Sequence, residues 1–318
     1  MQLPSNNRIL FVFSDPGGAK PLLALIENSQ VNNYKVFSDR IYPFYKDFGI
    51  TISDPPVDWH NELEEYAPNI VVTGTSYTSS LELDVLSIAA DVGIFTISFV
   101  DHWTNISNRF SSKKYQALYP NEIWLVDERA KMIAINEGID EGRLKVIGNP
   151  YHQWLNNWEP EVDKQEYLNT IGINNNAPVL LFGPDSLSNV DGKRKYGFDE
   201  ISATKDILDL MEGSLTDIGN CNFLIKPHPN QNVEPLMEIV NNYPFASILS
   251  SNVDTNTVLY YSDVVIGFFS SLLLESCVLN KKVIRFIPTP INNDPFENMN
   301  VGEKVDCSTF INRLKLCL

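Results

Sequence analysis

Short apolar runs alternate with helical patterns along most of this chain, and the alternation restarts about halfway. In the first half the apolar runs are 8–13, 69–73, 94–100, 122–126 and 144–147. They lack the alternation of polar and apolar residues that a half-exposed strand shows, so each predicts a strand buried on both faces. Such strands, separated by helices, form a parallel sheet that is covered on both sides.

The second half repeats this pattern after a polar, acidic stretch at 156–165, which we interpret as a linker. Its predicted strands are 178–182, 222–226, 246–249, 264–267 and 283–287, and the helical patterns along the chain are 19–26, 80–92, 128–137, 198–211, 233–240, 271–279 and 307–318. A chain of 318 residues is long enough for about two domains. We therefore predict two tandem Rossmann-like, doubly wound α/β domains, 1–155 and 156–318, which face a central cleft.

The charge of the chain excludes some partners. It carries 24 Lys and Arg against 40 Asp and Glu, a formal net charge of −16. Binding to nucleic acid needs basic side chains that neutralise phosphates, so we expect no nucleic-acid partner. The four cysteines show no paired spacing, and no Asp-x-Asp follows a strand, so we expect no metal site.

The longest apolar tract, 258–279, does not resemble a membrane span, because Asp263 and Glu275 interrupt it. The N-terminus shows no secretory signal pattern. We expect a cytoplasmic protein and leave open a peripheral association with the inner face of the membrane.

The loops that follow strands are the candidate sites, since ligands of open α/β sheets bind beyond the carboxyl ends of the strands. Lys226-Pro227-His228-Pro229-Asn230 is the strongest motif. Its two prolines restrict the backbone on either side of His228, whose imidazole can donate a hydrogen bond to a phosphate. The alternative interpretation is a rigid turn with a solvated histidine.

A second motif runs from Gly267 to Glu275, where a strand ends and a helix begins near Ser270 or Ser271. Free amides and hydroxyls at a helix N-terminus bind phosphate. Glu275, about one turn further on, could accept hydrogen bonds from ribose hydroxyls. The alternative is an ordinary cap on a buried helix. Gly183 and Ser186, after the first strand of the second domain, are expected to approach the same phosphate.

Two loops of the first domain carry further candidates. Asp15 precedes Gly17 and Gly18, whose backbone can approach a ligand closely, and Asp101-His102-Trp103 follows another strand. Asp15, Asp101 or His102 could accept a proton, and Trp103 could stack on a sugar. A tight turn and a capped helix with a core tryptophan are the alternatives.

The combination of His-Pro after one strand with Ser-Ser and Glu on a later helix resembles the donor half of GT-B fold glycosyltransferases. The form Lys-Pro-His-Pro is similar to bacterial CMP-sugar transferases of the sialyl and Kdo type, and to CDP-glycerol glycerophosphotransferases. The Ser and Glu spacing resembles UDP-N-acetylglucosamine 2-epimerases, although Ser271-Leu272 replaces their Gly-Gly. In these families the histidine and the serines hold the donor phosphate, which implies that role for His228, Ser270 and Ser271.

The resemblance implies a metal-independent glycosyltransferase of bacterial surface polysaccharide synthesis, such as capsule. It would move a sugar or alditol phosphate from a nucleotide-sugar donor, CMP- or CDP-linked, to a glycan or lipid-linked glycan acceptor, without a cofactor. We assign catalysis to Asp15, Asp101, His102 and His228, donor binding to Gly183, Ser186, Lys226, His228, Ser270, Ser271 and Glu275, and acceptor binding to Gly17, Gly18 and Trp103. Two alternatives stay open: an epimerase of UDP-N-acetylglucosamine, and a non-catalytic nucleotide- or glycan-binding partner. The sequence does not determine the oligomeric state.

Overall fold

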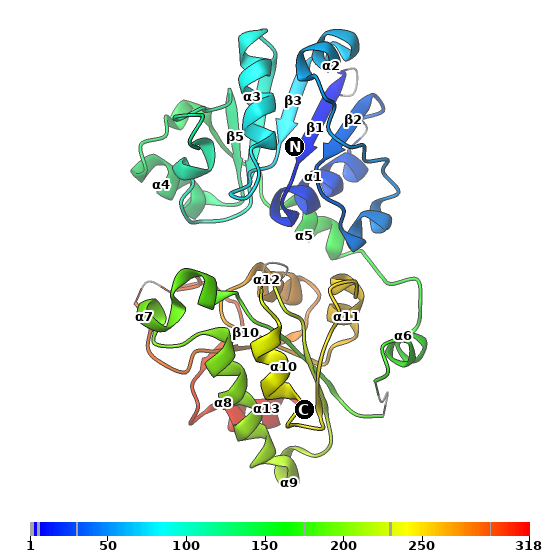
Figure 1. Ribbon diagram of the computed structural model, residues 1–318, viewed down its shortest axis with the longest axis vertical. Coiled ribbons are helices and arrows are strands. Elements are labelled where there is room, and N and C mark those ends of the chain that lie inside the picture. The colour runs from blue at the N-terminus through cyan, green and yellow to red at the C-terminus, as the bar shows by residue number, and fades with distance from the viewer. Residues whose placement is uncertain (1–2, 5–6, 30, 174–175, 229–230, 293) are drawn as a thin grey trace. The chain divides into compact units, whose positions relative to one another are not determined.

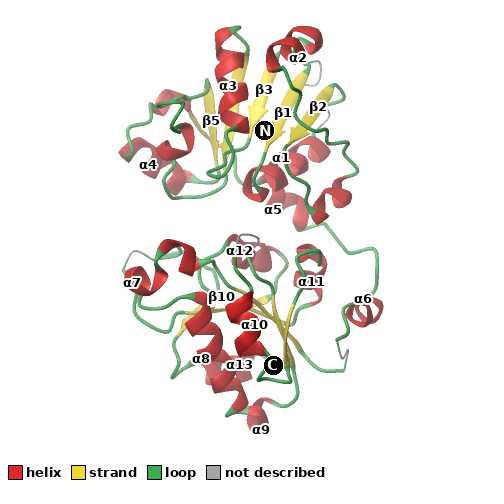
Figure 2. Cartoon of the chain, in the orientation of Figure 1, coloured by secondary structure: helices red, strands yellow, loops and turns green. Residues whose placement is uncertain are grey.

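The computed structural model describes residues 3–4, 7–29, 31–173, 176–228, 231–292 and 294–318. The chain divides into two compact units, Met1–Asn157 and Trp158–Leu318. Each unit contains one parallel β-sheet with helices packed against it (Figures 1 and 2). The prediction of two Rossmann-like α/β domains is confirmed.

In the first unit, the described strands form a sheet of order β2-β1-β3-β4-β5-β6, and every neighbouring pair is parallel. The strands are β1 (Ile9–Phe13), β2 (Tyr34–Ser38), β3 (Ile70–Thr73), β4 (Phe95–Val100), β5 (Glu122–Leu125) and β6 (Leu144–Val146). All residues of β1 are buried, as expected for a central strand covered on both faces.

The helices of this unit cover both faces of its sheet. They are α1 (Pro16–Asn28), η1 (Pro43–Phe48), α2 (Trp59–Tyr66), α3 (Leu81–Asp91), η2 (Ser107–Phe110), α4 (Glu128–Asn136), η3 (Glu141–Arg143) and α5 (Pro150–Leu155). Leu10 and Val12 of β1 pack in one apolar cluster with Trp59 of α2 and Val85 of α3. Because successive side chains of a strand alternate, Phe11 points to the opposite face, and it is equally buried.

In the second unit, the described strands have the order β12-β11-β10-β7-β8-β9 and are again parallel. They are β7 (Val179–Gly183), β8 (Asn222–Ile225), β9 (Ala246–Ile248), β10 (Val264–Gly267), β11 (Lys282–Phe286) and β12 (Glu303–Val305). This order places β7 and β10 at the centre, with the strands that follow each of them on opposite sides.

The helices of the second unit are α6 (Lys164–Thr170), η4 (Leu187–Val190), α7 (Gly192–Tyr196), α8 (Glu200–Glu212), α9 (Leu215–Ile218), α10 (Glu234–Val240), α11 (Thr255–Tyr261), α12 (Ser271–Val278) and α13 (Phe310–Cys317). Helices α8 and α10 lie side by side (Figure 1), while α12 packs on β10 and β11 and α13 on β11. Within the described part of the chain, none of the helices has the length and apolar character needed to cross a bilayer.

Two edge strands were missing from the sequence-based assignment. β2 and β12 each lie at one end of a sheet, and their first two residues are not buried. An edge strand needs no continuous apolar run, so the pattern that revealed the central strands is absent there. A third difference is the start of α1, because Pro16 begins the helix and places Gly17 and Gly18 in its first turn.

Gly18 allows α1 and the loop after β3 to approach each other closely. A Cβ atom on Gly18 would lie 2.8 Å from the Cα of Gly74, and backbone atoms cannot move aside as a flexible side chain can. Gly18→Ala is therefore expected to lower the free energy of unfolding by about 1–3 kcal/mol, measured by urea denaturation. Gly213→Ala is the matched control, since its Cβ would meet its nearest neighbour at 3.5 Å. Equal effects of the two substitutions would contradict the role given to Gly18.

Candidate functional site

The sheet order of the first unit identifies the edge at which polar loops gather. β1 connects to β2 on one side and β3 connects to β4 on the other, so the loops after β1 and β3 diverge and leave a crevice at the carboxyl ends. Asp15 follows β1, and Thr75 and Ser76 follow β3. Candidate residues from both loops lie here.

The Asp15 carboxylate joins three segments of this unit. Arg40, after β2, donates to Asp15 Oδ1 at 2.6 Å, and the Thr78 hydroxyl donates to the same oxygen at 3.0 Å. The Ser76 hydroxyl donates to Asp15 Oδ2 at 2.7 Å. Since both oxygens of the carboxylate already accept hydrogen bonds, Asp15 organises the loops after β1, β2 and β3.

Asp101 makes a second ion pair at the same edge. Its Oδ1 lies 3.0 Å from Nη1 of Arg109, and the same nitrogen donates to Thr75 Oγ1 at 3.0 Å. The Arg109 guanidinium also lies 4.8 Å from the ring centroid of Tyr77. A Cβ on Gly17 would lie 2.0 Å from Asp101 Oδ2, so a side chain at this position would displace the Asp101 carboxylate.

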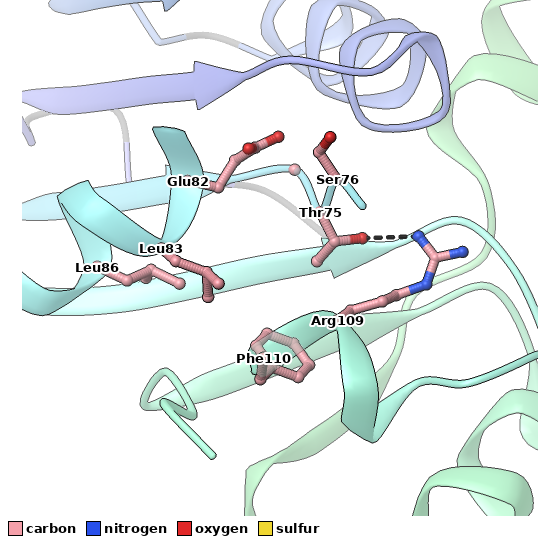
Figure 3. Close-up of a pocket in the computed structure, with 8 residues that line it drawn as sticks. Thr75, Ser76, Glu82, Leu83, Leu86, Arg109 and Phe110 are labelled. Atoms are coloured by element: carbon pink, nitrogen blue, oxygen red, sulfur yellow. Dashed lines mark hydrogen bonds between the residues drawn. The ribbon is translucent and has the colours of Figure 1, made fainter. Parts of the chain in front are cut away.

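A narrow pocket, partly open to solvent and without room for a water molecule, lies between these groups. It is lined by Gly74, Thr75, Ser76, Glu82, Leu83, Leu86, Arg109 and Phe110. Figure 3 shows the Arg109 side chain directed at Thr75, with Leu83, Leu86 and Phe110 lining another part of the pocket. The pocket therefore combines an apolar wall with charged groups.

Glu82 is the chemically unusual member of this pocket. It is 3% exposed, and its Oε1 accepts a hydrogen bond from the Ser14 amide at 2.9 Å. Its Oε2, the Ser14 hydroxyl oxygen and Arg109 Nε are buried without a hydrogen-bond partner among the described residues. Burial raises the pKa of Glu82 to about 8, so this carboxyl holds a proton at neutral pH.

His102 and Trp103 are adjacent in sequence but lie in different environments. Burial lowers the pKa of His102, so its imidazole is neutral at neutral pH, and its Nδ1 lies 3.1 Å from the Thr104 hydroxyl. Trp103 is only 6% exposed, and its indole N–H donates to Asp127 at 2.7 Å. Little of the Trp103 ring surface is therefore available for stacking on a sugar in this conformation.

In the second unit the corresponding crevice lies between β7 and β10. Gly183 and Gly267, the last residues of these strands, are paired in register. A Cβ on Gly183 would lie 2.1 Å from Cδ2 of Leu272 in α12, so the absence of a side chain at Gly183 makes room for this helix. The strand order thus brings Gly183 and the start of α12 to one edge.

Ser270 is the N-cap of α12, and its side chain makes no capping hydrogen bond. Its hydroxyl oxygen is buried and has no hydrogen-bond partner within the described residues. A buried hydroxyl beside the free amides of a helix N-terminus is suited to an anionic ligand. Ser271 is exposed, Glu275 is buried within the helix, and the Ser186 hydroxyl accepts a hydrogen bond from Asn189 at 2.8 Å.

The loop after β8 adds a cation and an imidazole. The Lys226 amide donates to the Phe182 carbonyl at 2.9 Å, which fixes this loop beside β7. Burial lowers the pKa of Lys226, an effect that the nearby Asp254 opposes. His228 is exposed, and its amide donates to Gln231 Oε1 at 3.1 Å. Pro229 and Asn230 of the same motif lie outside the described residues.

Sequence reasoning overlooked Arg40, Glu82 and Arg109. Arg40 follows β2, a strand that the apolar pattern did not reveal, and Arg109 is a single basic residue in a polar segment. Glu82 did leave a signal, because it stands between Leu81 and Leu83 as Glu275 stands beside leucines. Across the part of the chain that the structure describes, no three His, Cys, Asp or Glu side chains are grouped as metal ligands would be.

Comparison with known proteins identifies the fold. No protein-family model matches the sequence, and no curated protein matches it. Among solved structures, UDP-GlcNAc 2-epimerase from Methanocaldococcus jannaschii is similar over 98% of this chain and 91% of that chain, with 13% identity and a TM-score of 0.65. The UDP-GlcNAc 2-epimerase from Neisseria meningitidis, bound to UDP-GlcNAc, matches over 96% and 90%, with 13% identity and a TM-score of 0.64. An Anabaena protein in complex with UDP-glucose matches over 98% and 90%, with 13% identity and a TM-score of 0.64.

The chain has the GT-B fold. The narrower expectation, a glycosyltransferase with a CMP- or CDP-linked donor, is wrong: the similar structures include several UDP-GlcNAc 2-epimerases, which support the epimerase alternative better. The error has a physical origin. An imidazole after one strand and serines at a helix start describe a phosphate-binding geometry, and a phosphate is common to CMP-, CDP- and UDP-linked sugars.

Glu82→Gln is expected to change how stability depends on pH. Burial raises the pKa of the folded-state carboxyl above that of an unfolded chain, so its stabilising contribution is present at acidic pH and is lost as the pH rises through about 8. The difference in unfolding free energy, variant minus wild type, should rise between about pH 5 and 8 by at most about 1.4 kcal/mol per pH unit. Urea denaturation at several pH values measures it. Exposed Glu65→Gln is the control, and a pH-independent difference for Glu82→Gln would contradict the buried protonated state.

Proposed function

We propose that this protein binds a UDP-linked sugar and inverts the configuration at carbon 2 of that sugar, with UDP-N-acetylglucosamine as the substrate. The observation that carries the proposal is a likeness in fold, over nearly the whole chain, to UDP-GlcNAc 2-epimerases. One of these similar structures contains both UDP-GlcNAc and UDP. Because a fold hosts many reactions, the proposal also needs support from the residues of the site.

The second unit supplies the groups that a diphosphate requires. Ser270 has a buried hydroxyl without a partner at the start of α12, and the loops of Gly183 and Lys226 lie at the same sheet edge. Leu272 occupies a position where the epimerases that the sequence resembles carry glycine. Gly183 lies opposite and has no side chain, so the bulk of Leu272 is accommodated without displacing the helix start.

The first unit supplies groups for proton transfer. Carbon 2 is not next to a carbonyl, so when a base removes its proton the electron pair forms a C1=C2 double bond while the C1–O bond to UDP breaks. Re-addition of UDP at carbon 1 and return of a proton from an acid to the other face of carbon 2 complete the inversion. His102 is neutral at pH 7 because burial lowers its pKa, so it can accept a proton. Glu82 keeps its proton up to about pH 8 because burial raises its pKa, and it is one of the residues that line the pocket of this unit.

Solvent deuterium tests the reaction. UDP-N-acetylglucosamine incubated with the protein in D2O is expected to form the 2-epimer, with deuterium at carbon 2 detected by NMR and mass spectrometry. His102→Gln is expected to slow the exchange by about 100-fold or more, since a general base contributes about that much. Exposed His60→Gln is the control. Tight binding without exchange or epimerisation would favour a non-catalytic binding partner instead.

Ser270→Ala tests the diphosphate site. Loss of a hydrogen bond to a charged group costs about 1.5–3 kcal/mol, so the affinity for UDP-N-acetylglucosamine should fall about 10- to 150-fold by calorimetry. Ser247→Ala, an exposed serine on the edge strand β9, should bind as the wild type does. Unchanged affinity in Ser270→Ala would place the diphosphate elsewhere.

A further inference from the structure

Asp185 lies at the sheet edge where the proposed diphosphate would bind, and neither the sequence motifs nor the proposed reaction assign it a role. It follows β7 by two residues, and its Oδ2 accepts a hydrogen bond from the Phe269 amide at 3.2 Å. Phe269 immediately precedes Ser270, the N-cap of α12. The Asp185 carboxyl is thus hydrogen-bonded to the residue that precedes Ser270, whose hydroxyl has no partner among the described residues.

The surroundings of Asp185 offer it little positive charge. Glu200 of α8 is fully buried nearby and accepts hydrogen bonds from the amide and the hydroxyl of Ser188, the latter at 2.5 Å. Arg285 of β11 is the nearby cation, but its guanidinium is engaged by Asp294 and by the Phe268 carbonyl. Lys304 of β12 also faces Asp294, at 3.7 Å. Asp185 and Glu200 therefore have a cation near them, Arg285, and its charge is already neutralised by Asp294.

We propose that Asp185 couples nucleotide-sugar binding to proton uptake: the Asp185 carboxyl must be protonated when a diphosphate occupies the start of α12. This inference rests on the proposed function, because it concerns the same diphosphate site. A diphosphate at Ser270 adds negative charge beside a carboxyl that is hydrogen-bonded to the amide of the preceding residue, Phe269. A second negative charge beside the half-buried Asp185 carboxyl disfavours its ionised form, and a proton on Asp185 removes the repulsion.

The pKa of Asp185 in the free protein fits this geometry. Burial raises the pKa of Asp185 to about 7, with a further contribution from the charge of Glu200, while the Phe269 amide and Arg285 act in the opposite direction. Below pH 7 the carboxyl is already protonated, so binding takes up no proton. Above pH 7 it is ionised, so binding must take up one, and affinity falls as the pH rises.

Calorimetry with UDP-N-acetylglucosamine tests the coupling, since the phosphates of this ligand do not titrate near neutral pH. The wild-type affinity is expected to weaken about tenfold between about pH 6 and pH 8. At the higher pH, the binding enthalpy should depend on the ionisation enthalpy of the buffer with a slope close to one proton. In Asp185→Asn, whose amide oxygen can still accept from Phe269, the pH dependence and the proton uptake should both shrink.

Asp191→Asn is the matched control, because it removes an exposed negative charge from the same β7–α8 connection and leaves Asp185 in place. Its pH dependence should equal that of the wild type. His228 is present in all three proteins, so the difference between them reports Asp185. Wild-type binding with equal pH dependence in Asp185→Asn would overturn the inference and leave the proposed function intact. Absence of binding at every pH would overturn both.

Discussion

Parallel strands that are buried on both faces leave a polar ligand only the ends of the sheet. Strands β1, β7 and β10 are apolar throughout and buried, so the hydrogen-bonding side chains that a ligand can reach lie in the loops beyond the carboxyl ends. The strand order then selects the position along that edge, between β1 and β3 in one unit and between β7 and β10 in the other. The pairs Gly18 with Gly74 and Gly183 with Leu272 keep these loops close enough to share contacts.

Anion binding by a chain with a net charge of −16 depends on local groups. The arginines near the candidate sites are already paired: Arg40 with Asp15, Arg109 with Asp101, and Arg285 with Asp294. At the proposed diphosphate site, the Ser270 hydroxyl has no partner among the described residues, and the free backbone amides at the start of α12 lie beside it. Neutral donors hold an anion without the desolvation cost of a second set of buried ions. At a site with few cations, the protonation state of the Asp185 carboxyl therefore has a large effect on the affinity for a diphosphate.

The architecture was predictable because a buried parallel strand requires a continuous apolar run, and ten of these runs occur in the sequence. The strands at two sheet edges were not predictable, since Lys35 in β2 and Glu303 in β12 reflect exposure to solvent. Arg40 was not predicted for the same reason, because it follows β2, which the apolar pattern did not reveal. The motif around Ser270 was found because a strand end followed by serines and a helix is a local pattern. The prediction of a CMP- or CDP-linked donor was wrong, because this pattern describes the binding of a phosphate and not of the base.

The sequence by itself determined the two α/β domains, the strand ends at which chemistry occurs, and Ser270 and His228 as candidates for phosphate binding. These features depend on residues that are close in sequence. Only the tertiary structure decided that Glu82 lies in a pocket with Arg109 and that Asp185 bonds the loop before Ser270. Glu82 and Arg109 are 27 positions apart, and Asp185 and Phe269 are 84 apart. Each pair meets because the parallel crossovers return the chain to the same sheet edge. Their protonation states follow from burial, which is a property of the folded chain and not of any local pattern.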